Sequence, residues 1–346
     1  MPADRIPRRR CLSILAGLGA LALSGDQARR AAALEWRGVA LGAEARLLFH
    51  GPDRERTQAA LRRVLAEVER LERIFSLYRP ESELCRLNAA GRLAAPSFDL
   101  LAVLALGQRI SEASGGAFDP SVQPLWRALA RHFARRPGAA PTEAQLAPVL
   151  ALVDHRRIKI APDRITLGPG MALTLNGIAQ GYVTDRVSDL LRGLGFGSVL
   201  VQFGETRALP GRVWRVGAPG FGRPFGLSGM AVATSAGAAT PLSRDGRWTH
   251  LLHPRRGPGG GRFRSVTVVA ATAAEADALS TALAVVTAPE ADRLARRFPE
   301  ARVIAIDADG RRLHLGSANT KERSLVLVPA LRSPQVGSSP TRPPEN

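Results

Sequence analysis

The sequence predicts an α+β fold in which mixed sheets pack against helices. Short apolar runs typical of strands and amphipathic segments typical of helices follow one another without a regular βα alternation, which disfavours a doubly wound parallel sheet. With 346 residues, of which 45% are hydrophobic, the chain can bury a large core and can form one sizeable domain or two ordinary ones. A globular protein is therefore expected.

The first part of the chain predicts one strand, two helices and a linker. Apolar and polar residues roughly alternate over residues 35–49, which indicates a strand. Over residues 61–75, apolar residues recur at helical spacing with charged residues between them, which predicts an amphipathic helix. A second helix is expected over residues 100–114, since a Gly-Gly pair follows it. Residues 133–148 are rich in Ala, Pro and Arg, and we expect a linker with a short helix there.

The second part of the chain mixes strands and helices and ends in a polar tail. The apolar runs at residues 198–204 and 264–271 are typical of strands. Residues 329–346 have no apolar period, so a disordered tail is expected.

The N-terminus has the pattern of an export signal. Residues 5–33 begin with basic residues, continue with an apolar stretch too short to span a bilayer, and end in small residues. Arg8 and Arg9 precede a variable residue and an apolar pair, as in twin-arginine signals. A disordered basic tail is the alternative. We expect residues 1–33 to be removed, so that the mature chain begins near Leu34 in the periplasm.

Charge and residue usage exclude several classes of function. The formal net charge is +18, but the basic residues are scattered and only 5% of residues are aromatic, which disfavours nucleic-acid binding. Cys11 and Cys85 are the only cysteines, so no disulfide framework or Cys-based zinc site is available. The six histidines show no HExxH spacing. Any metal is therefore expected to be held by oxygen atoms.

Residues 272–283, TAAEADALSTAL, form the sharpest local pattern. Thr272 and Glu275 have the spacing of a capping box, which predicts the start of a helix. Asp277 and Thr281 are four residues apart and therefore share one helical face. A carboxylate and a hydroxyl so placed can supply two oxygens to Mg²⁺, which keeps other positions for water and phosphates. A solvated helix surface is the alternative.

Residues 173–211 supply a possible phosphate-binding loop. A Gly-bearing segment leads into an amphipathic helix, so free backbone N–H groups at the helix start face whatever binds the loop. A tight turn that needs Gly explains the same pattern. No GxGxxG or GxxxxGK[ST] motif occurs between a strand and a helix, which disfavours the ordinary nucleotide-binding folds.

Six segments in one order resemble the ApbE family, the FAD:protein FMN transferases, and together they cover most of the chain. They are FSLYRPESELCRLNAA (75–90), GGAFDPSVQPLW (115–126), NGIAQGYVTDR (176–186), AVATSAG (231–237), WTHLLHPRRG (248–257) and EADALSTAL (275–283). The resemblance implies one FMN transferase domain over residues 34–328, with T-fold-like halves. It also implies that FAD is the substrate and that Mg²⁺ is the cofactor.

The resemblance further assigns roles to individual residues. The implied magnesium ligands are Asp277, Thr281 and the backbone carbonyl of Gly177. The implied FAD contacts are Leu41, Tyr78, Ala117, Phe118, Asp119, Thr174, Gln180, Thr234, Ser235 and Leu251. For three of these contacts another reading stays open: a core position for Leu41, a half-buried core aromatic for Tyr78 and a turn residue for Asp119.

The implied chemistry is phosphoryl transfer. A Thr or Ser hydroxyl of a target protein attacks the FMN-side phosphorus of FAD, and AMP leaves. Mg²⁺ at the pyrophosphate neutralises the charge that builds on its oxygens. His250 is the candidate general base by position, and a loop histidine that packs on Trp248 is the alternative.

Two departures from the family pattern favour one branch of it. Thr174 stands where the family usually has Asp, and Gln180 stands where it has Lys. Together with GETRALPG (204–211), they resemble the NosX-like proteins of nitrous oxide respiration, for which the acceptor is the periplasmic domain of a NosR-like membrane protein. A periplasmic protein that binds or hydrolyses FAD without modifying any protein, and an assembly factor without a cofactor, are the alternatives.

Overall fold

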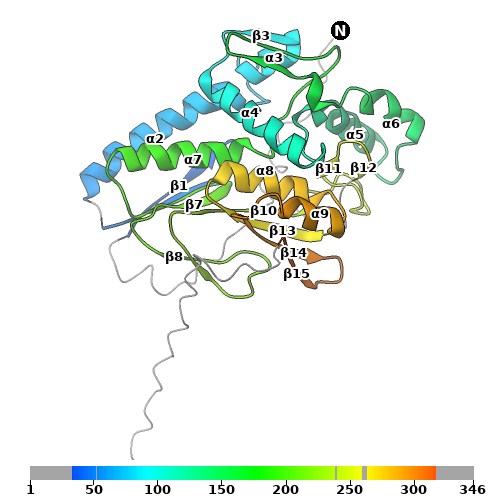
Figure 1. Cartoon of the computed structure of the whole chain (residues 1–346). Helices are drawn as coiled ribbons and strands as arrows, with labels where there is room; N and C mark the ends of the chain where they lie inside the picture. The colour runs from blue at the N-terminus through cyan, green and yellow to red at the C-terminus, as the bar shows by residue number, and fades with distance from the viewer. Residues whose placement is uncertain (1–32, 52, 238–239, 259–262, 317–346) are drawn as a thin grey trace, which may run out of the picture.

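The computed structural model describes residues 33–51, 53–237, 240–258 and 263–316, and its centre is one eight-stranded sheet (Figure 1). Every neighbouring pair of strands in this sheet is antiparallel. In spatial order the strands are β1 (Ala33–Ala40), β2 (Ala43–His50), β6 (Val199–Phe203), β7 (Glu205–Ala208), β10 (Ala231–Ser235), β13 (Phe263–Ala270), β14 (Arg302–Asp307) and β15 (Arg312–Leu315).

A layer of helices covers one face of the sheet. Figure 1 shows α2 (Arg54–Phe75), α7 (Ala179–Gly193) and α8 (Ala273–Ala284) above the strands, with α4 (Phe98–Ala113) above them. The periodic apolar positions of α2 face this core, and Val64, Val68 and Leu71 are buried. Helix α8 is buried along nearly its whole length, because the sheet, α4 and α7 all contact it. Helix α9 (Ala288–Ala295) follows α8.

The opposite face of the sheet is closed by a hairpin of β8 (Trp214–Val216) and β9 (Phe225–Leu227), with β8 below the sheet in Figure 1. A second apolar cluster fills this interface, with Leu200, Val232 and Val269 from the sheet packed near Phe225 and Leu227. Both faces of the central strands are therefore covered, which explains why these strands are apolar runs rather than alternating ones.

A smaller unit stands beside the helix layer. It contains η1 (Pro120–Val122), α5 (Gln123–Arg135), α6 (Glu143–Leu150), β11 (Leu252–His253) and β12 (Gly257–Pro258), and a third apolar cluster joins α5 to Trp248 and Leu252. The remaining elements are α3 (Glu83–Ala90), β3 (Arg92–Ala94), η2 (His155–Arg157), β4 (Lys159–Ala161) and β5 (Arg164–Thr166), of which β3, β5 and β4 form a three-stranded sheet.

The structure confirms the predicted mixture of sheets and helices and corrects several boundaries. Residues 35–49 form two strands rather than one, because Leu41 and Gly42 both have positive φ and make a two-residue hairpin turn. Helix α2 begins at Arg54, since the Asp53 side chain caps its first turn. The expected linker at 133–148 contains the end of α5 and most of α6, which has a full capping box.

Two of the predicted segments cannot be compared with the structure. The polar tail and all of the export signal except Ala33 lie outside the described residues. Within the described ranges, no helix is both long and apolar enough to cross a membrane.

Candidate active site

A cleft lies where the loop before α7, the cleft-facing side of α8 and the loops around residues 117–122 and 250–254 meet. It brings together residues that are far apart in the sequence. Eleven of the predicted site residues line it. Its lining consists of Ala117, Phe118, Asp119, Pro120, Val122, Trp126, Thr174, Asn176, Gly177, Gln180, Glu205, Ser235, His250, Leu251, Leu252, Pro254, Asp277 and Thr281.

The loop before α7 and helix α8 touch through glycines. A Cβ at Gly177 would lie 2.9 Å from Oγ1 of Thr281, and a Cβ at Gly181 would overlap the backbone of Ala273. The Gly181 N–H donates to Oδ2 of Asp277 at 3.1 Å. This backbone N–H therefore holds a protein carboxylate, whereas the sequence predicted that such groups face the ligand. Asp277, Thr281 and the Gly177 loop consequently meet at one point of the cleft.

A second carboxylate lies beside Asp277. Glu205 and Asp277 line the same cleft with only 6% and 4% of their surfaces exposed. Burial raises the pKa of Glu205 well above its usual value, and the Asp277 charge raises it further, while a backbone hydrogen bond from Thr234 lowers it. Burial also raises the pKa of Asp277 to about 7, with the Gly181 hydrogen bond opposing the shift. Two acidic groups therefore share a site that disfavours their charges.

This electrostatic imbalance fits a divalent cation. In the part of the chain that the structure describes, no Lys or Arg forms an ion pair with Asp277 or Glu205, although two buried carboxylates need a compensating charge. Among the described residues, no group of three or more His, Cys, Asp or Glu side chains is placed to hold a metal ion. The oxygens on offer are carboxylate, hydroxyl and backbone carbonyl, which is the donor chemistry that Mg²⁺ prefers.

The loop at residues 117–122 is shaped by Asp119. Its Oδ1 accepts from the backbone N–H and the hydroxyl of Ser121 at 2.8 and 2.6 Å, and its Oδ2 accepts from the His155 N–H at 2.9 Å. The Asp119 carboxylate is therefore used to hold the turn, as the alternative reading of this residue proposed. Ala117 and Phe118 are presented to the cleft by the same turn.

Two side-chain nitrogens of the cleft lack a hydrogen-bond partner among the described residues. They are Nε2 of Gln180 and Nδ1 of His250, and both are buried. Burial lowers the pKa of His250, so its imidazole is neutral at pH 7. Trp248 packs on Phe133. A bound ligand can satisfy both free nitrogens.

Hydrogen bonds in the turn after β11 stabilise the wall of the cleft that contains Leu251. Nδ1 of the buried His253 accepts from the N–H groups of Arg255 and Arg256, each at 3.2 Å. Burial lowers the pKa of His253 to about 4, and the charges of the two arginines add to this effect. Arg255 also donates to the carbonyl of Gly115. The wall that carries Leu251 is thereby tied to the loop that carries Ala117.

Three predicted FAD contacts lie outside the cleft lining. Thr234 and Ser235 are neighbours on β10 and point to opposite faces: Ser235 bonds Ser280 of α8 at 2.8 Å, whereas Thr234 bonds Thr267 at 3.0 Å. Leu41 and Tyr78 lie at the end of α2. Glu72 connects their segments, since it accepts from the Leu41 N–H and pairs with Arg79.

Leu41 and Tyr78, at the end of α2, are both accessible to solvent. Tyr78 has 53% of its surface exposed, and Leu41 has a φ of 50°, which costs a Leu residue about 1 kcal/mol. Leu41 is partly buried and packs against the main apolar core, and Tyr78 is about half exposed. The alternative readings, a core position for Leu41 and a half-buried core aromatic for Tyr78, therefore stay open.

Sequence reasoning missed Glu205 altogether. It also missed the apolar wall made by Val122, Trp126 and Leu252. The available signal was the position of Glu205 directly after the buried strand β6 and Gly204, whose φ of 87° turns the chain. A carboxylate at the buried end of a strand is uncommon unless it has a task.

A sequence model of the ApbE family matches residues 41–305. The chain belongs to the ApbE family. The matched span of this ApbE chain contains every residue of the cleft and also Leu41 and Tyr78. The motifs that resembled the family in sequence are therefore the segments that the fold brings to the cleft and to its outer end.

Relatives of this ApbE chain share both sequence and fold with it. The FAD:protein FMN transferase of Treponema pallidum (strain Nichols) is 30% identical over 285 residues, which cover 73% of this chain and 78% of that protein. The one from Klebsiella pneumoniae (strain 342) is 30% identical over 249 residues, covering 65% and 75%. The structure of flavin transferase ApbE from Vibrio cholerae matches with a TM-score of 0.72 at 24% identity, covering 83% of this chain and 98% of that one. This likeness confirms the predicted α+β fold.

Proposed function

We propose that this ApbE chain transfers FMN from FAD to a Thr or Ser hydroxyl of a target protein and releases AMP. The observation that carries the proposal is the meeting of Asp277, Thr281 and the Gly177 loop beside Glu205, in a cleft lined by family motifs. Relatives that cover most of the chain bear the name FAD:protein FMN transferase. The geometry adds carboxylate, hydroxyl and carbonyl oxygens suited to a divalent cation.

We further propose that Asp277, Thr281 and the Gly177 carbonyl hold Mg²⁺, with Glu205 close by. An ion held by these residues would supply positive charge to offset the charge on the pyrophosphate oxygens. Asp277 must lose its proton to act as a ligand, and its raised pKa makes this step sensitive to pH.

The reaction exchanges one phosphate ester bond for another. The acceptor oxygen bonds to the FMN-side phosphorus, the bond from that phosphorus to the bridging oxygen breaks, and AMP leaves with this oxygen. The hydroxyl proton needs a base. His250 suits this task because it lines the cleft and its lowered pKa keeps it neutral. The Gln180 amide donates a hydrogen bond to the substrate in place of the usual Lys.

The cellular setting is also proposed from the sequence. The twin-arginine pattern at Arg8 and Arg9 supports export to the periplasm, and the NosX-like features support an acceptor in a NosR-like membrane protein during nitrous oxide reduction. Replacing both arginines with Lys is expected to leave the full-length precursor in the cytoplasm, as measured by cell fractionation and immunoblotting. Normal processing of that variant would refute the twin-arginine route.

The test of the proposed reaction follows both products. Mature protein is incubated with FAD, Mg²⁺ and the periplasmic domain of a NosR-like protein. Mass spectrometry is expected to find FMN on a Thr or Ser of that domain, with one AMP released for each modification. AMP and free FMN in equal amounts, without modified protein, would show that the chain is an FAD pyrophosphatase instead.

A further inference from the structure

Helix α5 exposes an unusual row of positive charge. Arg127, Arg131 and Arg135 recur at intervals of four residues, Arg136 follows directly, and the helix contains no Asp or Glu. All four side chains are exposed, and none forms an ion pair among the described residues. Like charges four residues apart destabilise a helix by a few tenths of a kcal/mol per pair.

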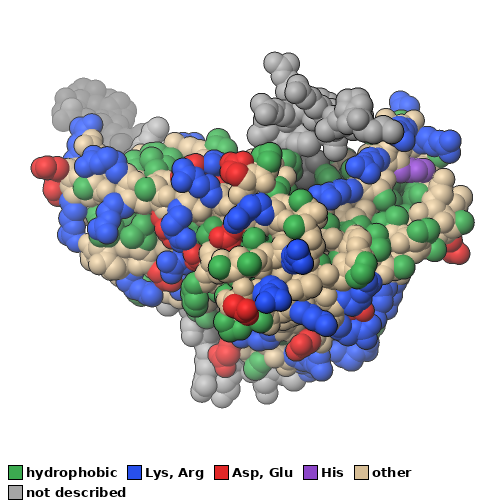
Figure 2. Space-filling view, turned by 90° about the horizontal axis from the view of Figure 1, so that it is seen from above, with side chains coloured by type: hydrophobic (Ala, Val, Ile, Leu, Met, Phe, Trp, Pro, Cys, Tyr) green, Lys and Arg blue, Asp and Glu red, His purple; other side chains and the backbone are tan. Residues whose placement is uncertain are grey.

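The abundance of Arg in the chain does not account for this row. Helix α2 is also rich in Arg, but there Glu residues are interleaved and several pairs form, including Arg70 with Glu67 and Arg73 with Glu69. Blue side chains are spread over the face in Figure 2, and red ones lie among many of them. The uncompensated row on α5 therefore differs from an ordinary solvated helix surface.

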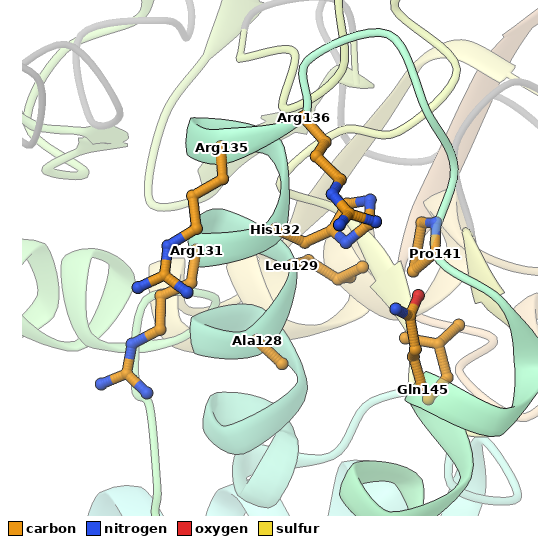
Figure 3. Close-up of a pocket in the computed structure, with 9 residues that line it drawn as sticks. Ala128, Leu129, Arg131, His132, Arg135, Arg136, Pro141 and Gln145 are labelled. Atoms are coloured by element: carbon orange, nitrogen blue, oxygen red, sulfur yellow. The ribbon is translucent and has the colours of Figure 1, made fainter.

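The row borders a groove between α5 and α6, which we call the α5 groove. Its volume is about 360 Å³, and its lining is Ala128, Leu129, Arg131, His132, Arg135, Arg136, Pro141, Gln145 and Leu146. Figure 3 shows Arg136 and His132 on the side of α5 that faces Pro141 and Gln145, with Arg131 and Arg135 at the other edge. An apolar floor under cationic edges suits an extended peptide with acidic side chains.

The α5 groove and the catalytic cleft are joined by one helix. Trp126, in the first part of α5, lines the cleft, while Arg135 lies nine residues further along. At 1.5 Å and about 100° per residue, this separation is about 14 Å along the helix axis and half a turn around it, so the groove and the cleft lie on opposite sides of α5. An acceptor whose hydroxyl enters the cleft must therefore extend around the helix to place other residues in the groove.

We propose that the α5 groove binds an acidic segment of the flavin-acceptor protein. This inference rests on the proposed function. Opposite charge then raises the rate of encounter with the acceptor and fixes which hydroxyl enters the cleft.

The first test measures binding alone. A fluorescein-labelled hexaglutamate peptide is titrated with the mature chain at low salt, and its anisotropy is followed. The double variant Arg131→Glu, Arg135→Glu is expected to bind it at least about tenfold more weakly than the wild type, an effect of about 1.4 kcal/mol. The control is Arg62→Glu, Arg63→Glu, because these exposed α2 residues form no ion pair with another described residue and their reversal changes net charge equally. Its affinity is expected to stay within about twofold of the wild type.

Several outcomes of this titration would overturn the proposal. One is equal loss of binding in both double variants, which would indicate a general charge effect. Another is no binding of the peptide by the wild type. A third is tighter binding of an oligothymidylate than of the peptide, with the same dependence on Arg131 and Arg135, which would identify a nucleic-acid site.

The second test uses transfer to the acceptor domain. The Arg131→Glu, Arg135→Glu variant is expected to raise the KM for the acceptor at least about tenfold and to leave the KM for FAD and kcat unchanged, with the defect shrinking as salt rises. An unchanged KM for the acceptor would contradict the proposal. Absence of transfer by the wild type would refute the proposed function, while the peptide titration would still decide whether the groove binds acidic chains.

Discussion

Asp277 carries the account at the scale of a single residue. Its carboxylate forms no ion pair with a basic residue among the described residues. It accepts a hydrogen bond from the Gly181 N–H and is buried beside Glu205. A carboxylate in such surroundings prefers its protonated form unless a cation arrives. In the proposed magnesium site, cation binding would therefore be coupled to proton release from this residue.

A pH dependence of stability follows from Asp277. Its pKa is raised to about 7, so the folded protein holds a proton that the unfolded chain loses from about pH 4 upward, and stability falls as pH rises to 7. Asp277→Asn removes this loss. Without divalent ions, the variant is expected to exceed the wild type in unfolding free energy by about 4 kcal/mol at pH 8 and to match it near pH 4.

Urea unfolding with a chelator present measures this difference at both pH values. Adding Mg²⁺ at pH 8 is expected to stabilise the wild type and to leave Asp277→Asn unchanged, because only the wild type offers the carboxylate. If the stability difference between Asp277→Asn and the wild type were the same at both pH values, the pKa of Asp277 would not be raised in the folded protein.

For single residues, the sequence correctly predicted contacts that depend only on spacing along one helix. Asp277 and Thr281 share a helical face because they are four residues apart, and they do line one cleft. Glu205 could not be added, since its proximity to Asp277 depends on how β7 lies beside β10 in the sheet. The resemblance implies both Thr234 and Ser235 as FAD contacts, although adjacent strand residues face opposite sides.

At the scale of elements, contacts between helices α7 and α8 position the site. Asp185 of α7 accepts from the N–H groups of Ala273 and Ala274 at 2.9 Å each, and it pairs with Arg207. Its burial nevertheless raises its pKa, because desolvation outweighs these favourable contacts. One side chain thus caps the start of α8 and joins it to α7 and β7.

Removal of this carboxylate is expected to be costly. Asp185→Ala leaves Arg207 and two N–H groups without their partner, and we expect a loss of about 3 kcal/mol in the free energy of unfolding. Asp189→Ala, a more exposed change on the same helix, is expected to cost less than about 1 kcal/mol. Equal losses in urea unfolding would show that Asp185 has no special role.

The boundaries of elements were predicted less well than their presence. Thr272 does cap α8, but the Glu275 side chain pairs with Arg109 of α4 instead of closing the capping box. The hairpin at residues 33–50 was merged into one strand, because its turn contains Leu rather than the expected Asn or Gly at the first central position. In both places a tertiary contact or an unusual turn residue overrides the local pattern.

At the scale of the whole molecule, the class of the fold was predictable and its topology was not. Apolar runs and amphipathic segments suffice to indicate α+β. The strand order joins β2 to β6 and β7 to β10, and these pairings bring together segments separated by long stretches of chain. The unit of α5 and α6 was expected as a linker, whereas its own apolar cluster attaches it to the cleft.

The central claim is that this molecule attaches FMN to a protein through the Asp277 cleft. Transfer to the acceptor domain, followed by mass spectrometry with excess FAD and Mg²⁺, compares the wild type with Asp277→Asn and with the control Asp189→Asn. The account predicts a rate at least about a thousandfold lower for Asp277→Asn, equivalent to about 4 kcal/mol of lost transition-state stabilisation, and a near-normal rate for Asp189→Asn. Flavin transfer by Asp277→Asn at the wild-type rate would contradict it.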